Sequence, residues 1–273
     1  MEEYIVSNLN SLPVSRSKKV LVFVLLGLIL LVAGTFFAVD WMNYLYGLSN
    51  LYTSYAKGFV SLLCAVIAWM IGMNFVDRKD ALLLKLAFLC IVPTDILMGI
   101  VAVNSKASQA TILTAFIIGA VLSIIAHALL IIRHGRGFGW VRPSKSGRPV
   151  TSALALPLFF VAVGAVTFLL LADGLANVGL FYPGLAYVII IVVSLWVAWE
   201  AVRNRLYPKM NALMIALAIT SWFITEIIGS IYNIQIGTVS FISFNIVWVF
   251  YTPTVVLLAL SGYRWKKEEG WKA

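Results

Sequence analysis

Charged residues are scarce in this chain of 273 residues: Asp, Glu, Lys and Arg make up 11% of it, whereas hydrophobic residues make up 62%. A soluble domain carries about 25% charged residues, because its surface has to be solvated by water. This shortage excludes an ordinary water-soluble domain and indicates an integral membrane protein.

Cysteine and histidine are also rare, with two residues of each. Cys64 and Cys90 are too few for a disulfide framework, and we expect both to be small apolar packing residues. His127 and His134 do not follow a metal-ligand pattern, and the sequence contains no nucleotide-binding loop. We therefore expect neither a metal nor any other cofactor.

Long apolar runs recur at a regular spacing along the chain. A bilayer core about 30 Å thick needs roughly 20 apolar residues per helix, whereas a β-barrel needs segments of about 10 residues with strict alternation. Continuous runs such as VLVFVLLGLILLVAG favour helices. We predict an all-α, polytopic membrane protein that forms one domain, a bundle of eight transmembrane helices at residues 19–39, 55–75, 81–103, 109–133, 150–171, 179–201, 211–231 and 241–262.

The first of these runs follows three basic residues, as the apolar core of a signal peptide does. Its apolar core is long, however, and no A-x-A cleavage pattern follows it. We expect it to be retained as the first span.

The basic residues alternate between the two sides of these predicted helices. Seventeen of the 20 Lys and Arg residues fall in the two termini and in every second loop, while the opposite loops contain only Lys106. Because basic loops stay in the cytoplasm, we expect cytoplasmic termini, an external Lys106 and a location in the plasma membrane. The net charge of +9 then reflects topology and contact with anionic lipids. The basic residues are scattered over short segments, which gives no support for nucleic-acid binding.

A short internal similarity links the two halves of the chain. Thr94-Asp95-Ile96 and Thr225-Glu226-Ile227 occupy the third and seventh predicted helices. A four-plus-four duplication would place these helices in equivalent positions, as repeats in some membrane proteins do. The repeat is a hypothesis that rests on this one match.

Three ionisable residues lie deep inside predicted spans: Asp95, Glu226 and His127. Such groups cost at least about 2.5–3.5 kcal/mol to insert and usually face the bundle interior or a water-filled cavity. At 1.5 Å per residue, Asp95 lies roughly 12 Å and Glu226 roughly 8 Å from the outer end of its helix. We predict that these two carboxyls share a polar cavity in the outer half. His127 lies roughly 27 Å from that side, nearer the cytoplasm.

Each ionisable residue also has a purely structural interpretation. The carboxyls and His127 can serve in hydrogen bonds between helices, and Lys57 can extend from the start of its helix to the outer headgroups. Lys85 and Glu200 lie near cytoplasmic helix ends, where a solvated or capping role is sufficient.

Several stretches of the chain resemble the lysoplasmalogenase (YhhN-like) family of eight-helix membrane proteins, of which it looks like a divergent member. They are Lys57-Gly58-Phe59, DALLLKLAFLCIVPTDIL at 80–97, GAVLSIIAH at 119–127, Pro183 through Tyr187, and SWFITE at 221–226. The family usually has Lys-Pro at the first stretch, Gly-Asp and Ser-Asp at the two carboxyls, and Tyr-Ala-Gln where this chain has Tyr251-Thr252-Pro253.

The resemblance implies hydrolysis of the vinyl-ether bond of lysoplasmalogen, with a membrane lipid as the substrate. Asp95 and Glu226 would then be the catalytic acid and base, in an order that the sequence does not fix. The resemblance further implies that Lys57 binds the lipid phosphate. The other residues expected to contact the substrate are Thr94, His127, Tyr187, Thr225 and Tyr251. Two other classes stay open: a proton-coupled transporter and a non-catalytic membrane protein. The oligomeric state does not follow from the sequence.

Overall fold

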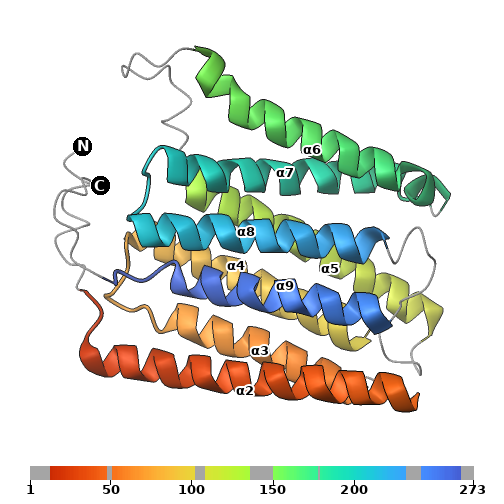
Figure 1. Cartoon of the computed structure of the whole chain (residues 1–273), viewed down its shortest axis with the longest axis horizontal. Helices are drawn as coiled ribbons and strands as arrows, with labels where there is room; N and C mark the ends of the chain where they lie inside the picture. The colour runs from red at the N-terminus through yellow and green to blue at the C-terminus, as the bar shows by residue number, and fades with distance from the viewer. Residues whose placement is uncertain are drawn as a thin grey trace. The chain divides into compact units, whose positions relative to one another are not determined.

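The computed structural model describes residues 13–47, 51–101, 108–135, 150–177, 179–231 and 241–265. Within these ranges the chain is helical, and its only extended pairing is an isolated bridge between Phe75 and Tyr263. The elements, labelled in Figure 1, are α2 (Arg16–Tyr46), α3 (Leu51–Trp69), α4 (Arg78–Ile96), the π-helix η1 (Leu97–Val101), α5 (Gln109–Gly135), α6 (Val150–Asn177), α7 (Phe181–Arg203), α8 (Lys209–Ser230) and α9 (Phe241–Leu260). Lys106 and most of the predicted loop at 134–149 lie outside the described residues.

The chain divides into two compact units, and each is described by itself. Unit 1 consists of Met1–Leu129 and Val255–Ala273, and unit 2 of Leu130–Thr254. Both boundaries fall inside a helix, so α5 and α9 contribute to both units. The four-plus-four repeat stays a hypothesis.

Helices that follow one another in the chain pack together within each unit. In unit 1, α3 contacts α2, α4 and η1, and in unit 2, α7 contacts α6 and α8; Figure 1 shows the two series of neighbouring helices. On α2 the buried residues Val22, Ile29, Phe36 and Asn43 recur every seven residues. This spacing keeps one stripe of the helix against its neighbours.

Several helices expose large apolar side chains on the faces opposite to their buried residues. Leu30 on α2 and Leu169 on α6 are 71% and 73% exposed. Six helices within the described ranges are long and apolar enough to cross a membrane. Lipid is the solvent that matches such surfaces, so this multi-pass helical character supports an integral membrane protein. A count of eight spans stays a prediction.

The first two helices differ most from the predicted segments. α2 continues to Tyr46, and Gly47 ends it in a left-handed conformation (φ 65°) whose N–H group donates to the carbonyls of Asn43 and Tyr44. α3 instead ends at Trp69, because the following turn bends back through Gly72, which also has a positive φ (53°). Asp40 therefore lies inside a helix, not in a loop after it.

The segment after α9 is tied to the α3–α4 turn inside unit 1. The Arg264 N–H donates to the Asn74 carbonyl at 2.8 Å, and the Tyr263 hydroxyl donates to the Ile67 carbonyl at 2.5 Å. The Val14 N–H donates in turn to the Arg264 carbonyl. These bonds satisfy backbone groups where the helices end.

Candidate functional site

Asp95 lies where helix α4 loses its regular hydrogen bonding. Pro93 has no N–H group, so the Leu89 carbonyl loses its usual helical donor. Directly after Asp95 and Ile96 the chain forms the π-helix η1, a feature frequent at functional sites. The Asp95 side chain is buried and lies near enough to Cys64 on α3 for electrostatic interaction. The irregular backbone thus holds this carboxyl against α3.

Thr94, the neighbour of Asp95, fastens this part of α4 to α5. Its hydroxyl donates to the Cys90 carbonyl at 2.9 Å and to the Gly119 carbonyl at 3.3 Å. Gly119, Ser123 and His127 are four residues apart and all buried, so they share one face of α5. The His127 side chain has no exposed surface. Thr94, Asp95 and His127 therefore belong to the polar interior of unit 1.

Lys57 does not extend to the outer headgroups, in contrast to one interpretation of the sequence. Its Nζ atom lies 2.5 Å from Oδ2 of Asp40 on α2, and neither side chain is exposed. The same ammonium group lies 5.4 Å from the centroid of the Phe36 ring. A lysine needs a counter-charge inside a membrane protein, and Asp40 supplies it.

Glu226 forms the centre of a second polar site, in unit 2. Trp222 Nε1 donates to its Oε1 at 3.0 Å, and the Tyr187 side chain on α7 also hydrogen-bonds to this carboxyl. Glu226 and Tyr187 are partly exposed. At 1.5 Å per residue, they lie roughly 6 Å from the end of α8 and roughly 9 Å from the start of α7. The carboxyl therefore lies near one end of these helices.

Two aromatic rings of α9 continue from Trp222, the residue that donates to this carboxyl. The Tyr251 ring on α9 meets Trp222 edge-on, with centroids 6.2 Å apart, and meets Trp248 at 5.1 Å. Tyr251, Trp222 and Trp248 are buried. Thr225 is also buried, and its hydroxyl donates back to the Ser221 carbonyl of its own helix. We call Glu226, Tyr187, Trp222, Trp248 and Tyr251 the Glu226 site.

The predicted site residues fall into two groups, one in each unit. Unit 1 contains Lys57, Thr94, Asp95 and His127, and unit 2 contains Tyr187, Thr225, Glu226 and Tyr251. Within unit 2 the structure brings Tyr187 and Glu226 into contact. The shared cavity expected for Asp95 and Glu226 stays a prediction, because the two carboxyls belong to different units.

Sequence reasoning missed three residues that the structure places beside predicted ones. Asp40 falls in a predicted loop, because the sequence predicts that the first helix ends at residue 39. Trp222 and Trp248 lie in the apolar spans of α8 and α9, where an aromatic residue carries no functional signal of its own. The signal for Trp222 was its spacing of four residues from Glu226, which places both on one helix face.

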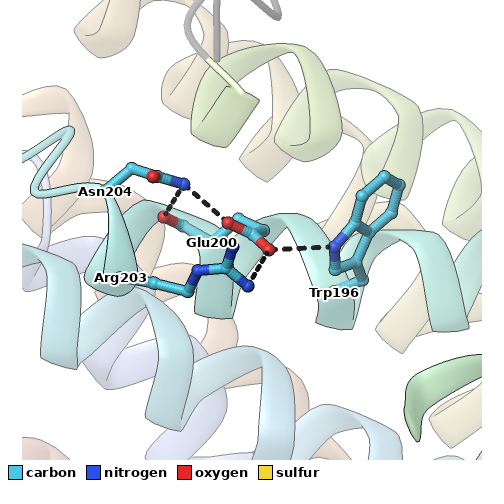
Figure 2. A network of polar contacts seen from close by, with 4 residues as sticks. All are labelled: Trp196, Glu200, Arg203 and Asn204. Atoms are coloured by element: carbon cyan, nitrogen blue, oxygen red, sulfur yellow. Dashed lines mark hydrogen bonds and ion pairs between the residues drawn. The ribbon is translucent and has the colours of Figure 1, made fainter. Parts of the chain in front are cut away.

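Glu200 has a structural role at the end of α7. Its side chain is buried and accepts hydrogen bonds from Trp196 Nε1 at 3.4 Å and from Asn204 Nδ2 at 2.6 Å. Arg203 Nη1 lies 3.0 Å from Oε1 (Figure 2). The carboxylate is thus not solvated; it closes the C-terminal turn with residues of its own helix and the Asn204 cap.

No family model, curated protein or solved structure matches the chain. The described part of the chain contains no group of three or more His, Cys, Asp or Glu side chains placed to hold a metal ion.

Proposed function

We propose that the chain is a membrane-embedded hydrolase that cleaves the vinyl-ether bond of lysoplasmalogen-type lysophospholipids. The observation that carries the proposal is the Glu226 site: one carboxyl that hydrogen-bonds to Tyr187 and to Trp222, a member of an aromatic cluster with Tyr251 and Trp248. Among the described residues this carboxyl is not ion-paired with a basic side chain. A carboxyl without a basic partner can hold a proton and deliver it to a substrate.

Vinyl-ether hydrolysis begins when an acid protonates the β-carbon of the double bond, which leaves an oxocarbenium ion. Water then adds to this cation and loses a proton, and the hemiacetal collapses to an aldehyde and a glycerophospho head-group. Glu226 can supply the first proton. The faces of the aromatic rings of Trp222 and Tyr251 attract a cation that forms beside them.

The second carboxyl of the proposed pair is Asp95. It would stabilise the cation and deprotonate water, while Glu226 acts as the acid, since two carboxyls in different environments can divide these roles. The irregular helix around Asp95 supports this assignment. Thr94, His127, Thr225 and the Lys57–Asp40 pair would shape the binding site for the lipid.

The decisive experiment supplies purified protein with a lysoplasmalogen and, separately, with its saturated alkyl-ether analogue. We expect aldehyde release from the vinyl ether alone, because only a double bond can accept a proton on carbon. No cleavage of the vinyl ether, or equal cleavage of both ethers, would contradict the proposal.

A proton-coupled transporter is the second candidate, and one observation favours it. The ionisable side chains that unit 1 buries include Asp40, Asp95, Lys57 and His127. Intramembrane ionisable groups in such numbers also mark proton relays. Solute uptake into vesicles that depends on a pH gradient, in a protein that cleaves no vinyl ether, would select the transporter.

We also propose how the chain crosses the membrane. Eight spans with both termini in the cytoplasm of the cell would follow from the distribution of Lys and Arg. A reporter fused after Ala273 should read as cytoplasmic in intact cells. A reporter at Lys106 should read as external, and the opposite result at either position would overturn this topology.

A further inference from the structure

A groove of about 500 Å³ lies between α3 and α4 of unit 1. Its lining is almost wholly apolar and includes Val66 and Trp69 from α3 and Leu89 and Pro93 from α4. Val66, Trp69 and Leu89 are exposed, whereas the lining residue Ala65 is buried beneath them. The volume is in the range of about 300–1,000 Å³ typical of small-molecule sites. The groove therefore opens outward and has room for part of a ligand with an apolar chain.

One end of the groove carries positive charge. Trp69 is the last residue of α3, and the Lys85 ammonium lies 5.8 Å from the centroid of its ring. The Lys18 ammonium from α2 donates to the Ile71 carbonyl at 3.0 Å and to Asn74 Oδ1 at 2.8 Å, just beyond Trp69 in the chain. Lys18 and Lys85 are close enough to repel each other.

The repulsion between these two lysines is not relieved by a carboxylate. Within the described ranges, neither Lys18 nor Lys85 forms an ion pair. The acidic residues nearest to Lys85 in the sequence, Asp77 and Asp80, are buried, and Asp77 caps α4 by accepting the Lys79 N–H at 3.0 Å. An anion at the end of the groove would balance both ammonium groups.

We propose that this groove binds an acyl chain of an anionic phospholipid and that Lys85 and Lys18 hold its phosphate. Trp residues at helix ends mark the membrane–water interface, and a lysine one or two turns deeper extends its ammonium to that level. The acyl chain of the lipid thus lies against the apolar part of the site, and its phosphate lies beside the basic part. This site shares no residue with the Glu226 site and does not depend on the proposed hydrolase activity.

The full chain can be tested by native mass spectrometry with equimolar phosphatidylglycerol and phosphatidylcholine of identical acyl chains. We expect the protein to retain one phosphatidylglycerol in clear preference to phosphatidylcholine. An interfacial lysine contributes about a five-fold gain in affinity for anionic lipid. Lys85→Gln and Lys18→Gln should each reduce the preference by about that factor. Lys79→Gln is the matched control, because Lys79 is an exposed lysine of the same helix that does not border the groove.

A second variant tests the groove itself. Val66→Trp fills the groove and leaves both lysines in place, so this variant should abolish retention of either lipid. If Val66→Trp does not fold, Leu89→Trp is used in its place. Equal retention of the two lipids would overturn the proposal, as would an equal effect of Lys79→Gln. Retention unchanged by a filled groove, or a second copy of the chain in place of the lipid, would also overturn it.

Discussion

Lys57 on α3 and Asp40 on α2 form a fully buried ion pair, with 2.5 Å between Nζ and Oδ2. The other carboxylate oxygen of Asp40 has no hydrogen-bond partner among the described residues. The pair therefore joins two neighbouring helices of unit 1 through a single strong contact. Its position inside the protein gives Lys57 a structural task in addition to any role toward a lipid.

Asp40→Asn and Lys57→Met should each destabilise the protein, because either change leaves a buried charge without its partner. The expected loss is about 3–5 kcal/mol for a single variant. The double variant should recover a large part of this loss, since it removes both charges. Unfolding in detergent, followed for the four proteins of this cycle, measures the effect. Lys79→Met, at an exposed lysine, is the control, and single variants as stable as the control would refute the interpretation.

Asp95→Asn and Glu226→Gln should each lower vinyl-ether cleavage by about 10²–10⁴-fold, because an amide cannot deliver the proton or stabilise the cation. The fold should survive, since the amide has nearly the same size and keeps hydrogen-bonding capacity. Asp173→Asn is the matched control, because Asp173 is exposed on α6. Aldehyde release gives the rate and thermal unfolding tests the fold. Near-normal turnover in both site variants would exclude the mechanism.

Tyr263→Phe should remove a pH dependence of stability. Tyr263 lies after α9, and burial raises the pKa of its phenol above the ordinary value of 10.0. In the unfolded chain the phenol ionises near pH 10, while in the folded chain it stays neutral, so the folded state is destabilised as the pH rises through 10. At pH 7 the variant should lose about 0.5–1.5 kcal/mol of stability, because it lacks the hydrogen bond to the Ile67 carbonyl.

The difference between the wild-type protein and Tyr263→Phe should therefore shrink between pH 9 and pH 11. The comparison cancels the contribution of the other tyrosines, which both proteins share. Unfolding measured across this range checks the prediction, and a constant difference would contradict it.

Two glycines should respond differently to alanine. A Cβ atom at Gly164 on α6 would lie 2.7 Å from Cγ2 of Val192 on α7, a β-branched side chain that has little freedom to move. A Cβ atom at Gly119 would meet the flexible side chain of Met98 at 2.9 Å. We expect Gly164→Ala to cost about 1–3 kcal/mol and Gly119→Ala distinctly less. Thermal unfolding of both variants decides, and an equal loss would show that Met98 cannot adjust.

The sequence by itself determined that this chain is helical and apolar enough for a membrane. A run of about 20 apolar residues can satisfy its backbone in lipid only as a helix, and each predicted segment coincides with much of a helix in the described residues. Helix ends were less predictable. Gly47 stops α2 only because it adopts a left-handed conformation, so the extra turns that contain Asp40 could not be recognised from hydropathy.

Which side chains meet was decided by tertiary structure. Both Tyr187 and Glu226 are site residues predicted from the sequence, but their contact depends on how α7 packs against α8. Lys57 and Asp40 are 17 residues apart on different helices, and their pairing depends on the rotation of α2 against α3. Hydropathy records how apolar each segment is along the chain, whereas this rotation follows from packing between the helices, which no single segment contains.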